Sequence, residues 1–537
     1  MSAVYDLLLE LVGVQSDTGT TQELAMAAKL HALILGHPYF AGHPDQCGTF
    51  EAGDVLGRPV VWALRRGTGR RTVILAGHYD AVDLEPYGWL KPYALDPVQL
   101  RAHLRESDIQ DPGLARDLED EAWGFGRGMA DMKAGLAINL DALFTLEGTA
   151  VNLLFLAVPD EENMSSGALQ SVALLHQLKD RFGLDYLVLL LTEPQIRTAA
   201  PAGTELLATG GTMGKMLPVV LTRGVVTHSA EILKGLNASY MLTEIVRRVE
   251  LNTDLVSEHL GVFTQPPTVQ IHRDLKTMYD VSVPEYAAAC FNFLFLKSRP
   301  PLTLLQDLER LCREAMEDVQ KRYQAAFDVM AAKGFITPGE RLQFQPEVLT
   351  LARLEGRLRD RYPDFAAFKG ETAARLKADL ASGRTNLPGA SIQYLKALAE
   401  KARLAGPTVL IGISPPYYPA VHHPDPGPAV EAALADLGGY LRDRHGIELR
   451  RVSYLSGMTD LSYTSLEDPA AERRFLDSLA LPRDLYDVPV EAIGQLDIPG
   501  FLIGPAGRDV HKRGERVYLP DVTTHVPDLI RRLVTRL

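Results

Sequence analysis

Cysteine is scarce in this sequence. The 537 residues include three cysteines, Cys47, Cys290 and Cys312, and no C-x-x-C pair. An odd number without paired spacing predicts neither a disulfide framework nor a thiolate metal site, and it favours a reducing compartment. We therefore expect a cytoplasmic protein whose chemistry depends on other side chains.

Basic residues and long apolar runs are also few. Lys and Arg number 55 against 68 Asp and Glu, which gives a net charge of −13 at pH 7. This balance predicts no nucleic-acid partner. No uninterrupted apolar run approaches the ~18 residues of a transmembrane helix, and the first residues, MSAVYDLLLELVGV, lack the basic start of a signal peptide. We expect no membrane partner.

The chain is too long for one hydrophobic core, which stops growing at ~250–300 residues. In its first part, the apolar runs RTVILA, NLLFLAV (152–158) and LDYLVLLL (184–191) alternate with segments of helical periodicity. This alternation predicts an α/β fold with a mostly parallel sheet buried on both faces. We assign residues 1–212 to the first part of a catalytic domain.

The order of the elements changes near residue 213. A strand, a helix, two strands, a helix and a strand follow, which is the ferredoxin-like β-α-β-β-α-β order. It predicts an inserted α+β lid domain at 213–355. Residues 356–390 are charged and broken by Gly and Pro, which predicts an irregular connection. Helix SIQYLKALAEKARL and strands PTVLIGI and IPGFLIG then resume the first pattern, so we assign 391–537 to the second part of the catalytic domain.

Acidic and histidine residues follow the ends of the predicted strands. In open parallel sheets, ligands bind outside the carboxyl ends of the strands. We therefore expect these side chains to lie together, and Asp131 to join them from the start of a predicted helix. The residues that follow strand ends are His78, Glu161, Glu162, Glu193 and His511.

Two imidazoles and three carboxylates without a thiolate suit hard-to-borderline divalent cations. Two dications would be balanced by three carboxylates and a bridging hydroxide, and a near-neutral site costs less to bury. One carboxylate is usually shared by ions ~3.5–4 Å apart, and Asp131 is our candidate for that bridge. The pattern predicts two divalent ions, with Zn²⁺ preferred and Co²⁺ or Mn²⁺ also compatible.

Glu161 stands next to Glu162, so their side chains diverge. One can bind metal while the other faces the attacking water, which predicts Glu161 as a general base that passes a proton to a leaving amine. Asp80, two residues after His78 on an extended segment, lies on the same side and can fix the imidazole. We expect hydrolysis of an amide bond by a water that bridges the two ions.

The motifs HYDAV, GRGMADMK, PDEEN, LLTEP and GPAGRDVH resemble, in this order, those of the dinuclear zinc family that contains glutamate carboxypeptidases, aminoacylases and the ArgE/DapE deacylases. The resemblance covers nearly the whole chain and implies a hydrolase with a ferredoxin-like lid. It implies that His78 and Glu193 bind one ion, that Glu162 and His511 bind the other, and that Asp131 bridges them. It also implies that Glu161 is the general base and that Asp80 supports the imidazole of His78.

A narrower resemblance is to the RocB branch of this family, which is linked to arginine utilisation. It rests on EPYGWLKPYALDP (85–97), SPPYYP (414–419) and SGMTDLSY (456–463), and also on PPTVQIHRDLKTMYDVSVPEY and GRDVHKRGERV. The branch implies a peptidase or a deacylase and no particular substrate. From the broader family we expect a small peptide or an N-acyl amino acid.

In the lid, the resemblance implies that His228 stabilises the tetrahedral oxyanion and that Asn237 contacts substrate. If the lid pairs with a second subunit, His228 would act across a homodimer. The family's lid arginine, which clamps a substrate carboxylate, has no clear equivalent here. Lys297 and Arg299 are possible substitutes, so carboxypeptidase specificity does not follow.

Each candidate also has a structural alternative. Asp131 could be a helix N-cap, as most Asp residues at helix starts are, and His78 could be a core histidine. Asp460 is a candidate for the substrate pocket and Glu515 for support of the ligands, and both are equally consistent with structural roles.

Two other functions are compatible with these residues: a dinuclear phosphoesterase and a binding protein with a vestigial metal site. Phosphoesterase sites usually carry more His and Asn ligands. A protein that only holds metal does not need a base such as Glu161. Both arguments favour the amide hydrolase.

Overall fold

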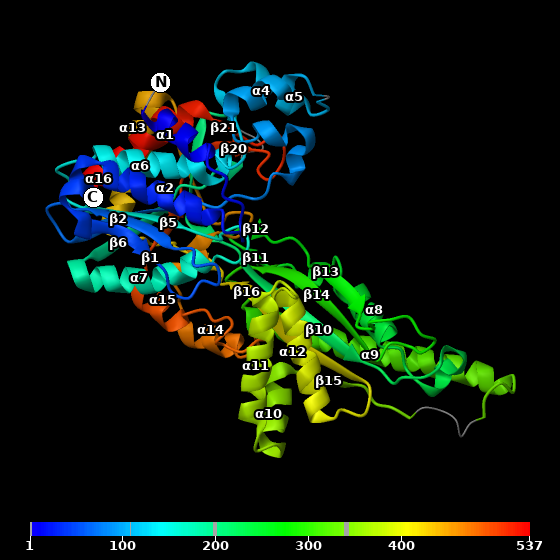
Figure 1. The fold of residues 1–537 in the computed structure, drawn as a ribbon. Helices are drawn as coiled ribbons and strands as arrows, with labels where there is room; N and C mark the ends of the chain where they lie inside the picture. The colour runs from blue at the N-terminus through cyan, green and yellow to red at the C-terminus, as the bar shows by residue number, and fades with distance from the viewer. Residues whose placement is uncertain (1–2, 108, 197–200, 338–342) are drawn as a thin grey trace. The chain divides into compact units, whose positions relative to one another are not determined.

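The computed structural model describes residues 3–107, 109–196, 201–337 and 343–537, and it divides into two compact units (Figure 1). Because the chain leaves the first unit and later returns to it, the second unit is an insertion, as the sequence predicts. The first unit comprises Met1–Thr212, Val421–Glu467 and Glu491–Leu537, and the second comprises Met213–Ala420 and Asp468–Val490.

An eight-stranded sheet forms the centre of the first unit. Its middle strands β5, β3, β6 and β19 run parallel, whereas β1, β2 and β5 are joined by antiparallel pairing. Every residue of β5 is buried, as expected for a strand covered on both faces. The predicted mostly parallel sheet is therefore confirmed. Across the sheet, the strands are β1 (Cys47–Phe50), β2 (Val60–Arg65), β5 (Asn152–Val158), β3 (Arg71–His78), β6 (Asp185–Leu191), β19 (Gly500–Leu502), β8 (Glu205–Thr209) and β18 (Glu448–Val452).

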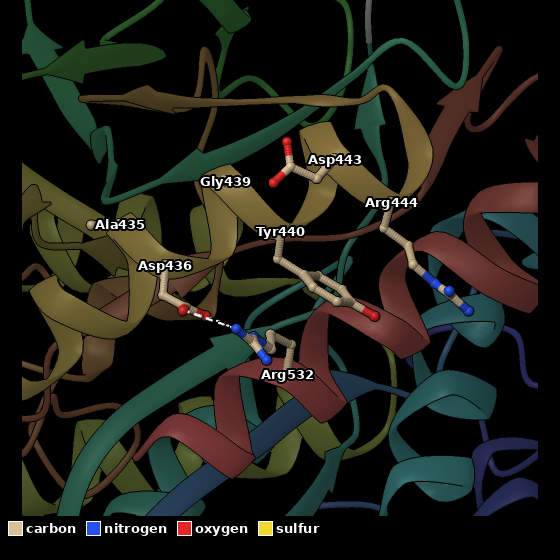
Figure 2. Close-up of a pocket in the computed structure, with 7 residues that line it drawn as sticks. All are labelled: Ala435, Asp436, Gly439, Tyr440, Asp443, Arg444 and Arg532. Atoms are coloured by element: carbon tan, nitrogen blue, oxygen red, sulfur yellow. Dashed lines mark hydrogen bonds and ion pairs between the residues drawn. The ribbon is translucent and has the colours of Figure 1, made fainter.

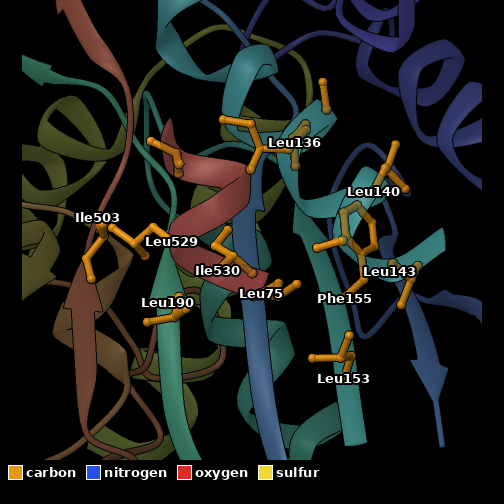
Figure 3. Close-up of a cluster of buried hydrophobic side chains, with 14 of the residues drawn as sticks. Leu75, Leu136, Leu140, Leu143, Leu153, Phe155, Leu190, Ile503, Leu529 and Ile530 are labelled. Atoms are coloured by element: carbon orange, nitrogen blue, oxygen red, sulfur yellow. The ribbon is translucent and has the colours of Figure 1, made fainter. Parts of the chain in front are cut away.

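Helices cover both faces of this sheet, with α2 and α6 on one side and α7 on the other (Figure 1). Leu136, Leu140 and Leu143 recur at helical spacing on α6 and pack toward Leu75 and Phe155 of the sheet (Figure 3). The main helices of the unit are α1 (Ala3–Val12), α2 (Glu23–Gly36), α6 (Ala134–Thr145), α7 (Ser166–Phe182), α13 (Pro428–His445) and α16 (Val526–Arg536).

A second, smaller sheet of the first unit has four strands, in the order β4 (Trp123–Phe125), β21 (Arg516–Tyr518), β20 (Ala506–Arg508) and β7 (Gln195–Ile196). The segment that leads into β4 contains η2 (Glu85–Tyr93), α4 (Pro97–Arg105) and α5 (Pro112–Glu119). Asp96 and Asp111 cap the two α-helices, and each cap is followed by a proline at the first helical position. Leucines of these helices pack with Trp123 and Phe125 into a small core of their own.

The second unit contains a five-stranded sheet. Strands β10, β13, β14 and β15 occur in the predicted order with α8 and α9 between them, and β10 pairs antiparallel with β14, with Val219 opposite Cys290. Its strands are β13 (Thr268–Asp274), β14 (Tyr286–Phe295), β10 (Gly214–Arg223), β16 (Thr408–Tyr418) and β15 (Glu347–Thr350), and its long helices are α8 (Ala238–Val249) and α9 (Pro301–Ala332).

Two features of the second unit differ from the predictions. Strand β16, which contains PTVLIGI, lies between β10 and β15 and not in the first unit. An apolar run shows that a strand is buried but not which sheet it joins. The unit therefore extends beyond the lid predicted at 213–355.

The prediction of an irregular connection at 356–390 is wrong. This stretch is helical, because Leu354, Leu358, Phe365 and Leu376 recur at helical spacing and are buried while the charged residues face outward. The helices are α10 (Leu351–Arg361), α11 (Phe365–Ala381) and α12 (Leu387–Ala402). Among the described residues of the whole chain, no helix has the length and apolarity needed to cross a membrane.

Candidate metal centre

The predicted metal ligands all lie in the first unit, four of them at or after the ends of strands and one before a helix. His78 is the last residue of β3, Glu162 lies in the turn after β5, and Glu193 is the second residue after β6. His511 lies in the loop between β20 and β21, and Asp131 lies in the turn before α6. The sequence places each residue correctly relative to its strand or helix.

The carboxylate of Asp131 lies between two imidazoles. Its Oδ1 is 3.0 Å from His78 Nε2, and its Oδ2 is 3.2 Å from His511 Nε2. His511 Nε2 is also 2.8 Å from Glu162 Oε1. Nitrogen and oxygen atoms of His78, Asp131 and Glu162 lie within 4.8 Å of one another, so these residues are close enough to share cations.

Asp131 is not a helix N-cap. Helix α6 begins at Ala134, its N-cap is Lys133, and that residue makes no capping hydrogen bond through its side chain. The backbone N–H of Asp131 instead donates to Glu515 Oε1, at 3.3 Å. Glu515 is buried against Arg127, so it supports the segment that presents Asp131.

Asp80 connects the imidazole of His78 to the turn after β5. His78 Nδ1 is 3.1 Å from the carbonyl oxygen of Asp80 and 3.4 Å from its Oδ1. The two carboxylate oxygens of Asp80 accept hydrogen bonds from the backbone N–H groups of Glu161 and Glu162, at 3.1 and 3.2 Å. Asp80 therefore holds the ring and also the two glutamates.

The charge of the site calls for cations. Burial raises the pKa of Glu193 well above its ordinary value, and burial with the nearby Glu193 carboxylate does the same to the pKa of Glu161. Glu193 Oε1 is buried without a hydrogen-bond partner among the residues that the structure describes. Buried carboxylates that lack partners are costly unless a cation or a proton shares them. This donor set of imidazoles and carboxylates fits divalent metal ions.

Close backbone contacts hold the Glu193 segment in place. A Cβ on Gly504 would lie 2.0 Å from the carbonyl oxygen of Glu193, and one on Gly135 would lie 2.2 Å from that of Thr192. Only glycine permits these approaches. The strand-end position of Glu193 thus depends on two residues that are remote in sequence.

Sequence reasoning missed Arg58, which is buried beside the same site. Its guanidinium lies 2.6 Å from Glu23, 2.8 Å from Asp54 and 2.7 Å from Asp160. Asp160 directly precedes Glu161. No local motif marks Arg58, because its partners come from three separate segments.

Asp460 also belongs to the first unit. It begins the short turn η7 (Asp460–Tyr463), where the Thr459 side chain caps the turn. Burial raises the pKa of Asp460 to about 7, and the charges of Asp80 and Asp160 add to the effect. It therefore lies within the electrostatic reach of the site.

The lid candidates lie in the second unit. His228 is exposed after β10 and accepts a backbone hydrogen bond at Nδ1, at 3.1 Å. Asn237 Oδ1 caps α8 through a bond of 2.8 Å to the N–H of Ser239. Arg299 donates to Asp307 and to two carbonyl groups. All of these contacts are made to residues of the second unit, so none of them tests a role in substrate binding. The substrate roles of His228 and Asn237 stay predictions.

A surface pocket of the first unit lies between α13 and α16 and has a volume of about 520 Å³ (Figure 2). It holds none of the predicted site residues. Its Asp436 and Arg532 form an ion pair of 2.7 Å. The residues that line it are Ala435, Asp436, Gly439, Tyr440, Asp443, Arg444 and Arg532.

Comparison with known proteins adds to this geometry. Residues 74–344 match the sequence model of peptidase family M20/M25/M40. YqjN of Bacillus subtilis (strain 168) is 33% identical over 99% of this chain and 95% of its own length. RocB of the same organism is 27% identical over 99% of this chain and 94% of its own length. The solved structure of the M20 family metallo-carboxypeptidase Sso-CP2 from Sulfolobus solfataricus has the same fold, with a TM-score of 0.54 at 13% identity over 100% of this chain and 99% of that chain.

Proposed function

The chain belongs to peptidase family M20/M25/M40, and from that premise we propose that it cleaves the amide bond of a small peptide or an N-acyl amino acid. Membership makes it a hydrolase of the dinuclear metallopeptidase type. The proposal rests on the position of the Asp131 carboxylate. One of its oxygens faces the imidazole of His78, and the other faces the imidazole of His511.

We propose that His78 and Glu193 hold one ion, that Glu162 and His511 hold the other, and that Asp131 bridges them. The ligand set is compatible with Zn²⁺, our first choice, and with Co²⁺ or Mn²⁺. When bound, the ions would polarise the amide carbonyl and lower the pKa of the attacking water.

Glu161 is the proposed general base. Asp80 holds its backbone N–H, while the side chain stays free of the proposed ligand roles. In this mechanism the Glu161 carboxylate accepts a proton from the attacking water and delivers it to the leaving nitrogen. His228 would help to hold the developing oxyanion, and Asn237 and Asp460 would contact substrate.

The substrate class, a small peptide or an N-acyl amino acid, is proposed from the family. From the similarity to RocB we further propose a link to arginine utilisation, with peptide and N-acyl forms both to be tested. A homodimer through the second unit and a cytoplasmic location also stay predictions.

The test is release of free amine from N-acyl amino acids and dipeptides, weighted toward arginine and ornithine. The protein would be loaded in turn with Zn²⁺, Co²⁺ or Mn²⁺. Cleavage that a chelator abolishes and added metal restores is the expected result. A protein with two metals per chain that cleaves none of the panel would contradict the proposed substrate class. Hydrolysis of a phosphate ester in its place would favour the phosphoesterase.

A further inference from the structure

The loop that presents His511 has a strained backbone. It connects β20 to β21, and Arg508 lies opposite Arg516 where the two strands pair. Asp509 and His511 have φ angles of 49° and 66°, in the left-handed region. Side-chain-bearing residues keep such angles only where their surroundings hold them. We therefore expect contacts from outside the loop to hold these backbone angles.

A single carboxylate, that of Asp117, contacts both ends of this loop. Asp117 lies on α5 and is only 2% exposed. Its Oδ2 is 2.5 Å from Arg508 Nη1 and 2.8 Å from Arg516 Nε. Asp117 thus contacts two arginines that lie 391 and 399 positions further along the chain.

The tie continues inside the loop. The Arg516 guanidinium also binds Asp509 and donates to the carbonyl oxygen of Gly514, at 2.9 Å. Trp123 lies under both arginines, with its ring centroid 4.7 Å from Arg508 Cζ and 5.6 Å from Arg516 Cζ. The contacts lead from Asp117 through Arg516 to Asp509, two residues before His511.

The carboxylates of Asp117 and Asp509 are paired with the guanidinium groups of Arg508 and Arg516, and Asp117 also pairs with the exposed Arg116, at 3.2 Å. Arg516 is itself 2% exposed, so loss of the Asp117 charge would leave this buried cation with Asp509 as its remaining carboxylate partner. The loop could relieve that imbalance by moving. Movement would shift His511 Nε2 relative to Asp131 and Glu162, which lie 3.2 and 2.8 Å away.

We propose that Asp117 is a positioning residue for one metal ion of the pair, the ion assigned to Glu162 and His511. This inference rests on the proposed function. The other ion, assigned to His78 and Glu193, takes no ligand from this loop. Asp117 should therefore set the relative affinity of the two sites.

The test is metal titration of Asp117→Asn in competition with a chelator, with metal per chain measured as well. We expect the wild type to bind two ions. The variant should keep the first ion with unchanged affinity and bind the second at least about tenfold more weakly. Asp117→Glu, which retains the charge, should restore part of the second affinity. The absorption of the Co²⁺-loaded protein should change only at the second equivalent.

The control is Asp436→Asn. Asp436 also pairs with two arginines, Arg532 and Arg536, at 2.7 and 3.1 Å. It is more exposed than Asp117, and it lines the pocket of Figure 2, which none of the proposed ligands lines. The Asp436→Asn variant should bind both metal ions with the same affinities as the wild type. Arg508→Gln removes the more exposed of the two arginines that Asp117 contacts, and it replaces Asp117→Asn if that variant does not fold. It should weaken binding of the same ion, but by a smaller factor.

Unchanged affinities in the folded Asp117 and Arg508 variants would overturn the inference, as would equal weakening of both sites. A wild-type protein that binds fewer than two ions would overturn the proposed function as well. The two failures are therefore distinguishable.

Discussion

The guanidinium of Arg58 lies 2.7 Å from Asp160 Oδ1, on the residue that precedes the proposed base. Asp160 has a φ of 66°, and its backbone N–H donates to Glu23 Oε2, at 2.9 Å. Arg58 binds Glu23 too, at 2.6 Å. One buried arginine thus fixes the turn after β5, much as Asp117 ties the loop of His511.

Arg58→Gln should be strongly destabilising. It would leave three carboxylates buried near one another without their cation, and breaking a buried ion pair costs about 3–5 kcal/mol. Urea unfolding measures the loss. Arg70→Gln is the control, since Arg70 is 70% exposed in its pair with Asp185, and its loss should be about 0–1 kcal/mol. Equal stability of the two variants would contradict the proposed role of Arg58.

Glu161→Gln should separate metal binding from catalysis. The amide cannot accept the proton of the attacking water, so kcat should fall by about 10²–10⁴-fold. Metal per chain should stay at the wild-type value, because Glu161 is not among the proposed ligands. The exposed Glu119→Gln serves as control. Full turnover by a metal-loaded Glu161→Gln enzyme would rule out this residue as the base.

Gly504→Ala should disturb the Glu193 segment. The new Cβ would lie 2.0 Å from the carbonyl oxygen of Glu193, and such overpacking costs about 1–3 kcal/mol. Thermal unfolding and metal titration should both show a loss. Gly438→Ala on α13, where a Cβ would meet no atom within 4 Å, should leave both unchanged or raise stability slightly. If the two variants had the same thermal stability and metal affinity, the Glu193 segment would be able to move away from the new Cβ without loss of stability.

The pH dependence of stability should include a contribution from Glu472 in the second unit. Burial raises its pKa above the ordinary 4.5, although the Tyr417 hydroxyl donates to it and opposes the shift. Because the folded state holds this proton more tightly, the stabilising contribution is complete below about pH 4.5. It is lost as pH rises through the folded-state pKa.

Glu472→Gln should therefore flatten the stability profile above pH 4.5, measured by urea unfolding at several pH values. Glu371→Gln, at an exposed position, should leave the profile as in the wild type. A profile for Glu472→Gln that runs parallel to the wild-type profile would disprove the contribution.

Local pattern was sufficient for the central strands and for the residues at their ends. The apolar runs of β3, β5 and β6 are visible in the sequence, because a strand buried on both faces must be apolar along its length. The side chain that follows such a run must lie at the carboxyl edge of the sheet. This is why His78, Glu162 and Glu193 could be predicted together without coordinates.

Periodicity was less informative where one pattern fits two placements. The apolar run of β16 suits a central strand in either unit, and it joins the sheet of the second. The charged stretch at 356–390 forms α10 and α11 because its apolar residues repeat at helical spacing. There, the abundance of charge obscured the helical pattern.

The buried ion pairs that support the site could not be predicted, although the role of Asp80 beside His78 was. Arg58 meets Asp160 from 102 positions away, and Asp117 meets Arg516 from 399. A charged residue carries no mark of a partner so distant, since any of the chain's many carboxylates could serve until folding brings one within reach. The sequence therefore predicts which side chains could do the chemistry, and the folded chain selects the buried ion pairs around them.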